Sequence, residues 1–145
     1  MTAALLLSAI LFLGSVASHL TILNVCHVML EDRPRFLSKL IIALLVLVSH
    51  LLVAAWYGGG FWIGHELDLG NFDKAPTMGW MEYFYFSLIN MTTLGLGDIY
   101  PTRHLRVIAG VEALTGFLLI SCSAQLFWSM MKKENPMDEM QSHSK

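Results

Sequence analysis

A strip of small and polar residues interrupts the apolar second half of the chain. From Asn90 to Pro101 the sequence reads NMTTLGLGDIYP, with two threonines, two glycines and one aspartate. Glycine accepts left-handed backbone angles, so Gly95 and Gly97, alternating with other residues, allow successive carbonyl oxygens to point the same way. Such a row of oxygens can replace the water around a cation. The strip therefore predicts a cation site built from backbone rather than from side chains.

The surrounding sequence has the composition of a membrane protein. Of the 145 residues, 55% are hydrophobic and 14% are charged, with a mean hydropathy of +0.58. The apolar share is above that of soluble domains, and the charged share is well below it. A net charge of −2, with no block of like charges, gives no reason to expect a nucleic-acid partner. Cys26 and Cys122 lie in apolar segments, so we expect small buried hydrophobes there rather than a disulfide or a metal site.

Three apolar runs are long enough to cross a bilayer, whose hydrocarbon core of about 30 Å takes roughly 20 residues of helix. We expect an N-terminal transmembrane helix at 1–30, an outer helix at 37–57 and an inner helix at 104–131. Residues 132–145 are polar and predict a short tail. This organisation leaves no room for a separate soluble domain.

The first run has two features that allow alternative interpretations. Ser15, Val16 and Ala17 resemble a signal-peptide cleavage site, but no basic region precedes them and the apolar character continues beyond them. The run also contains polar side chains that could suggest a metal site or a proton path, namely Ser18, His19, Asn24 and His27. The two histidines would lie about 80° apart around a helix, which favours hydrogen bonds between helices over a shared metal ion or a proton path.

Basic residues predict how the chain crosses the membrane. They gather between the first two runs and after the third: Arg33, Arg35, Lys39, Lys132 and Lys133. Because basic loops tend to stay in the cytoplasm, we expect the N-terminus outside and the C-terminus cytoplasmic, in a multi-pass protein of the cell (inner) membrane. Arg103 and Arg106 fall on the outer side, so this expectation rests on the balance of charges.

The segment between the second and third runs leaves and returns on the same side. We expect Gly58, Gly59 and Gly60 to end the outer helix, and 58–79 to form an extracellular loop in which Pro76 and Gly79 allow a restart. Residues 80–92 would make a helix about 20 Å long, too short to cross. This predicts a re-entrant half-helix that leads into residues 93–98, the part of the stretch that we call the strip from here on. Backbone without helical hydrogen bonds is tolerated at that depth only inside protein or beside water.

The stretch MTTLGLGDIYP resembles the TTVGYGD-and-proline signature of the pore-loop potassium channel superfamily, especially its small bacterial members. The resemblance covers roughly Trp80 to Met131 and does not explain the first span. It implies a tetramer in which each subunit contributes a pore helix, a selectivity-filter loop and an inner helix. Together with the three apolar runs, this predicts an all-α membrane protein, a homotetramer in lipid, with three transmembrane helices per subunit and a re-entrant pore helix. The implied function is passive conduction of monovalent cations, most of all K⁺, with no enzymatic activity and no cofactor besides the permeant ions. Residues 31–131 would then form the pore domain.

The same resemblance assigns roles to individual residues. The carbonyl oxygens of Thr93, Leu94, Gly95 and Leu96 would bind K⁺, and Gly97 would complete the filter. Support of the filter would fall to Thr92, Asp98 and Glu112, and Gly116 would be the hinge for gating. An acidic residue within a span, such as Glu112, should face protein or water rather than lipid. Glu112 could instead attract ions or make gating sensitive to protons, and these are the alternatives to a structural role.

Two departures from the family pattern leave alternatives open. Leu96 replaces the usual filter tyrosine and lacks its hydroxyl, and Ile89 replaces a glutamate that some bacterial channels keep behind the filter. A weakly selective sodium and potassium pore is therefore one alternative, and a non-conducting scaffold or partner subunit is another. A phosphate-binding glycine loop is disfavoured because no strand precedes the strip and no lysine follows it. The sequence does not determine the gating stimulus.

Overall fold

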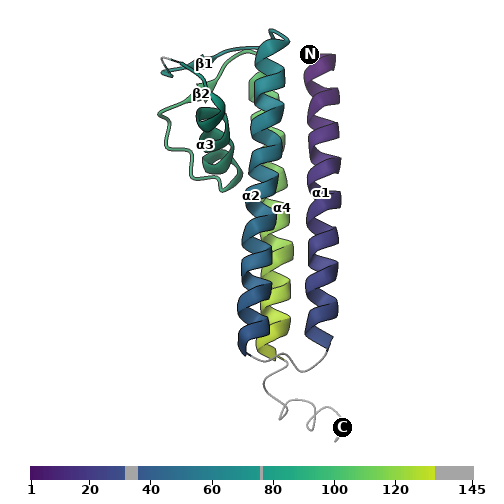
Figure 1. The fold of residues 1–145 in the computed structure, drawn as a ribbon. Helices are drawn as coiled ribbons and strands as arrows, with labels where there is room; N and C mark the ends of the chain where they lie inside the picture. The colour runs from purple at the N-terminus through teal and green to yellow at the C-terminus, as the bar shows by residue number, and fades with distance from the viewer. Residues whose placement is uncertain (32–35, 76, 133–145) are drawn as a thin grey trace, which may run out of the picture.

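The computed structural model describes residues 1–31, 36–75 and 77–132 and consists mainly of helices. Its elements are α1 (Thr2–Glu31), α2 (Phe36–Glu66), β1 (Phe72–Asp73), α3 (Trp80–Met91), β2 (Tyr100–Pro101) and α4 (Leu105–Lys132). The long helices α1, α2 and α4 pack side by side, and the short α3 lies against α2 and α4 near the end of the bundle that carries the strands (Figure 1). We call this end the strand end.

The expected fold class is confirmed. Helices α1, α2 and α4 are each long and apolar enough to cross a membrane, and α3 has only 12 residues. The N-terminus lies at the strand end (Figure 1). Several residues used in the predictions above lie outside the described part of the chain: Arg33, Arg35, Pro76 and the tail from residue 133 onwards.

Aromatic rings fix α3 against α2. Tyr57 and Phe61 of α2 are fully buried, and the ring of Phe61 lies edge-on to that of Phe86 of α3 at a centroid distance of 4.9 Å. Phe72 of β1 also meets Phe86, at 5.2 Å. Edge-on aromatic pairs add stabilisation beyond the burial of their area. This cluster therefore positions the short helix and the strand connection together.

The predicted end of the outer helix at residue 57 is wrong. Helix α2 continues through the glycines to Glu66, so the connection is shorter than the predicted loop at 58–79. The glycines permit close packing instead of breaking the helix. A Cβ at Gly58 would lie 3.3 Å from the backbone of Phe84 in α3, and one at Gly60 would collide with Leu11 of α1. Small residues let helices approach closely in membranes, where a continuous helix also satisfies the backbone.

Helix α1 is hydrogen-bonded to both other long helices through a buried histidine. His19 Nδ1 lies 2.6 Å from Ser49 Oγ of α2, and His19 Nε2 lies 3.2 Å from Ser123 Oγ of α4. The other polar residues of the run take no part in such bonds, since Asn24 and His27 are exposed and Ser18 bonds within its own helix. Within the described residues, no group of three or more His, Cys, Asp or Glu is placed to hold a metal ion.

The cysteine expectation is half correct. Cys26 is buried, whereas Cys122 is exposed on α4. An apolar sequence environment does not distinguish a face packed on protein from a face turned to lipid, because both are apolar.

Gly116 lies inside α4 at the point where α3 ends. A Cβ there would collide with the carbonyl oxygen of Met91, the last residue of α3. Gly110 of the same helix has nothing within 4 Å of such a Cβ. The structure thus gives Gly116 a role in packing, and its role as a hinge stays a prediction.

We predict that Gly116→Ala lowers the stability of the protein by about 1–3 kcal/mol, because the added methyl group overpacks the contact with α3. Gly110→Ala is the matched control and should be neutral or slightly stabilising, since alanine favours helix. Thermal unfolding of the detergent-solubilised protein measures both. Equal melting temperatures for the two variants would contradict the packing role.

Candidate functional site

The strip begins where α3 ends, and the last turn of α3 holds its first residues. The N–H of Thr93 donates to the carbonyl oxygen of Asn90 at 2.9 Å. The N–H groups of Leu94 and Gly95 both donate to the carbonyl oxygen of Ile89, at 2.9 and 3.3 Å. The amide hydrogens of these residues are therefore directed toward the helix.

The backbone of the strip alternates in hand. Thr93, Gly95 and Gly97 have positive φ angles of 57°, 52° and 74°, whereas Leu94 and Leu96 between them do not. Alternation of this kind turns successive carbonyl oxygens to one side. Glycine is needed here for its conformation rather than for space, because a Cβ at Gly95 or Gly97 would meet nothing within 4 Å.

The carbonyl oxygens at positions 93–96 accept no hydrogen bond from the described residues. The side chains of Leu94 and Leu96 are 61% and 59% exposed in the single chain. The strip starts level with Gly116, about 17 Å along α4 from its first residue, so it lies at membrane depth. Backbone in this condition requires protein or water beside it.

Glu112 is fully buried and joins α4 to α3. Its carboxyl group contacts Ser87 Oγ, and Asn90 Nδ2 donates to Oε2 at 2.6 Å. Asn90 also donates to the carbonyl oxygen of Ala109 at 2.8 Å, and Ser87 Oγ lies 2.7 Å from the carbonyl oxygen of Ala54 in α2. Among the described residues, Glu112 thus forms its hydrogen bonds with the short helix that carries the strip and not with the strip itself.

The hydrogen atoms available for the bonds among Ser87, Asn90 and Glu112 can be counted. Ser87 has one hydroxyl hydrogen, yet two oxygens lie within its reach, those of Ala54 and Glu112. A proton on the Glu112 carboxyl completes the pattern, because Glu112 then donates to Ser87 while Ser87 donates to Ala54. The set joins α2, α3 and α4 through side chains that are otherwise costly to bury.

Asp98 ends the strip and is bound to α3 by Tyr85. The Tyr85 hydroxyl of α3 donates to Asp98 Oδ2 at 2.6 Å, and the N–H of Ile99 donates to Oδ1 at 3.1 Å. The Tyr85 hydrogen bond, more than any other cause, lowers the pKa of Asp98. Sequence reasoning missed Tyr85, because nothing in the spacing of the chain pairs it with Asp98.

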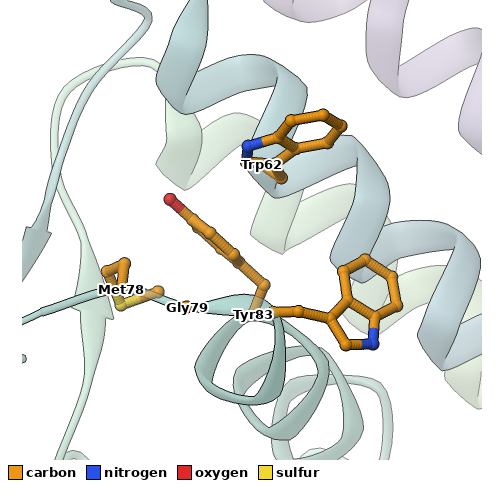
Figure 2. A pocket seen from close by; sticks show the side chains of 5 residues that line it. Trp62, Met78, Gly79 and Tyr83 are labelled. Carbon is orange, nitrogen blue, oxygen red and sulfur yellow. The ribbon is translucent and has the colours of Figure 1, made fainter.

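A shallow apolar groove lies elsewhere on the molecule. It has a volume of about 350 Å³ and is lined by Trp62, Met78, Gly79, Trp80 and Tyr83. The ring of Tyr83 rises from α3 between Met78 and Trp62 (Figure 2). This groove sits at the first turn of α3, about 18 Å from the end that begins the strip, and so it is separate from the candidate site.

Comparison with known proteins gives the family. A family model described as "Ion channel" matches residues 37–133, more than half of the chain. The chain therefore belongs to this ion channel family, which is not a family of enzymes. Another similarity is to "Potassium channel K2" of Plasmodium berghei (strain Anka), with 44% identity over 46 residues. The match covers 30% of this chain and 3% of that protein, so the chain spans only a small part of this relative. No solved structure matches.

We predict that Glu112→Gln keeps the stability of the protein, whereas Glu112→Leu lowers it by about 1–3 kcal/mol or more. The glutamine amide can donate to Ser87 and accept from Asn90, as the protonated acid does, but leucine leaves both unpaired. Thermal unfolding of the purified protein measures the difference. A glutamine variant as unstable as the leucine variant would mean that the set requires a charged carboxylate.

We predict that Tyr85→Phe shifts the acid limb of the stability profile to higher pH. The lowered pKa of Asp98 contributes stability that is present above its unfolded pKa of about 3.9 and is lost as the pH falls through the folded pKa. Without the hydroxyl, the pKa of Asp98 rises and this loss begins earlier. Melting temperatures between about pH 6 and pH 3 report the shift.

Tyr83→Phe is the matched control, because the Tyr83 hydroxyl on the same helix contacts His65 and not Asp98. Its acid limb should coincide with that of the unmodified protein. Coincident limbs for all three proteins would refute the contribution of Tyr85.

Proposed function

We propose that the chain is one subunit of a passive homotetrameric cation channel that prefers K⁺. In this proposal the carbonyl oxygens of Thr93, Leu94, Gly95 and Leu96 bind the permeant ions, with the Thr93 hydroxyl at the inner end. Four copies of the strip around one axis would surround a dehydrated ion with oxygens.

The single observation that carries the proposal is the row of unused carbonyls. Residues 93–96 accept no hydrogen bond from the described residues, while the N–H groups of Thr93, Leu94 and Gly95 are bonded to the end of α3. The alternating φ angles favour carbonyls that point to one side. A backbone whose N–H groups are hydrogen-bonded and whose carbonyl oxygens are free is suited to bind a cation.

The exposure of the strip supports assembly. Leu94 and Leu96 are more than half exposed in one chain, although the strip starts at membrane depth. One strip cannot surround an ion, and cyclic symmetry would bring further copies to the same axis. The C-terminal end of α3 carries partial negative charge next to Thr92, which would favour a cation held on the axis below the filter.

Orientation and support are part of the same proposal. The strand end, with the N-terminus, would face outside, and the C-terminal end of α4 would face the cytoplasm of the cell. Asp98, held by Tyr85, would support the outer end of the filter, and Glu112 would support it through Ser87 and Asn90 of the pore helix. Gly116 would serve as the gating hinge in addition to its packing role.

Reversal potentials of the purified protein in planar bilayers test this function. Under opposed potassium and sodium gradients, the reversal potential should follow that of K⁺. A potential near zero would favour the weakly selective cation channel, and absence of current would favour the scaffold or partner subunit. Each result excludes the other two.

The variant Leu96→Tyr refines this experiment, and it should raise the ratio of potassium to sodium permeability. A tyrosine hydroxyl can tie the filter to surrounding aromatic residues, which leucine cannot do. Leu94→Ile, which changes the branching of a neighbouring strip residue without adding a hydroxyl, is the control. An unchanged ratio in Leu96→Tyr would count against the missing hydroxyl as the source of any weak selectivity.

A further inference from the structure

A lysine from the strand connection reaches the outer end of the strip. Lys74 Nζ lies 3.3 Å from the carbonyl oxygen of Gly97 and donates a hydrogen bond to it. The same ammonium lies 4.8 Å from the centre of the Tyr100 ring, close enough for a cation–π contact. Gly97 therefore differs from residues 93–96, whose carbonyls accept no hydrogen bond from the described residues.

The fold holds Lys74 in this place. Asp73 of β1 pairs with Tyr100 of β2, so the residue that follows Asp73 is carried to the side of the strip. Lys74 itself has a left-handed φ of 69°, which is uncommon for a residue with a side chain. The register of the strands and this backbone angle together direct the side chain toward Gly97.

The carboxylate of Asp98 acts on the Lys74 ammonium from a distance but is not its direct partner. In the part of the chain that the structure describes, Lys74 forms no ion pair, and Asp98 is occupied by Tyr85 and the N–H of Ile99. A lysine ammonium is protonated at neutral pH at its ordinary pKa, and the hydrogen bond with Tyr100 raises the pKa of Lys74 further. The Gly97 carbonyl is thus already occupied by a monovalent cation, the ammonium group of Lys74.

We infer that Lys74 acts as a tethered cation at the outer mouth, which occupies the Gly97 carbonyl and limits the entry of external monovalent cations into the filter. This inference rests on the proposed function. In a tetramer, four ammonium groups would ring the entrance. Each would compete with an arriving ion both for the Gly97 oxygen and through electrostatic repulsion. Gly97, expected from the family resemblance to complete the filter, would then bind an ion only when Lys74 moves away.

Salt concentration separates this effect from a structural one. Exposed charges act over about 30 Å at 0.01 M ionic strength and about 3 Å at 1 M. Neutralising Lys74 should therefore increase inward current strongly in dilute salt and little in concentrated salt. A change in folding or in the number of channels would alter the current at both concentrations alike.

Arg103 provides a matched control. It is also an exposed cation at the strand end, but its guanidinium lies 3.6 Å from Asp68 rather than beside the strip. Arg103→Gln removes the same unit of charge from the same side of the molecule. It distinguishes a specific contact with Gly97 from a diffuse charge effect.

Single-channel recording of the full chain in planar bilayers tests the inference, with K⁺ lowered on one side at a time to identify the outer mouth. Relative to the unmodified channel, Lys74→Gln should raise inward conductance about two- to fivefold near 0.01 M K⁺ and leave it nearly unchanged near 1 M. Lys74→Arg should stay close to the unmodified channel in dilute salt. Arg103→Gln should produce a much smaller rise.

Two results would overturn the inference while the unmodified channel conducts K⁺. One is equal conductance of Lys74→Gln and the unmodified channel near 0.01 M, and the other is an equal rise in Arg103→Gln. Lys74→Met, a second neutral variant, checks the result if the glutamine variant fails to assemble. A silent unmodified protein would instead refute the proposed function itself, and this inference with it.

Discussion

The position of α3 depends on one buried set of hydrogen bonds. A helix of 12 residues is too short to cross a membrane and cannot be held there by hydrophobic length alone. Ser87, Asn90 and Glu112 connect it to both α2 and α4, and the rings of Phe61 and Phe86 fill the space toward the strand end. These contacts, together with the packing of Met91 against Gly116, position the end of α3 and with it the start of the strip.

The strip, in contrast to the well-bonded helix α3, has backbone groups without partners in the part of the chain that the structure describes. The N–H groups of Thr93, Leu94 and Gly95 are bonded to the last turn of α3, and the carbonyls of residues 93–96 are left without partners among the described residues. In an apolar environment an unpaired backbone group is expensive, so such a segment persists only where something else satisfies it. The contacts that hold α3 offset the cost of these unpaired carbonyls in the single chain. In the proposed channel, the ions and the neighbouring copies would provide the missing partners.

The polar contacts within the membrane divide into two levels along the bundle. At the level of α3, Glu112 joins α3 to α4, and further along, His19 joins α1 to Ser49 of α2 and Ser123 of α4. The first helix is thus bonded to α4, the helix that the proposed channel would use to line its inner pore. Its contact with that helix lies beyond Gly116, on the side away from the strands.

The sequence by itself determined the three long helices and the short one, because long apolar runs and a short one can be distinguished by length alone. It also determined the alternating glycines of the strip, since glycine is the residue that adopts left-handed angles without strain. Only the tertiary structure decided that Gly58 and Gly60 continue α2, that Glu112 bonds to Ser87 and that Tyr85 bonds to Asp98. These features join residues distant in the chain, and spacing along one sequence carries no information about which distant side chains meet.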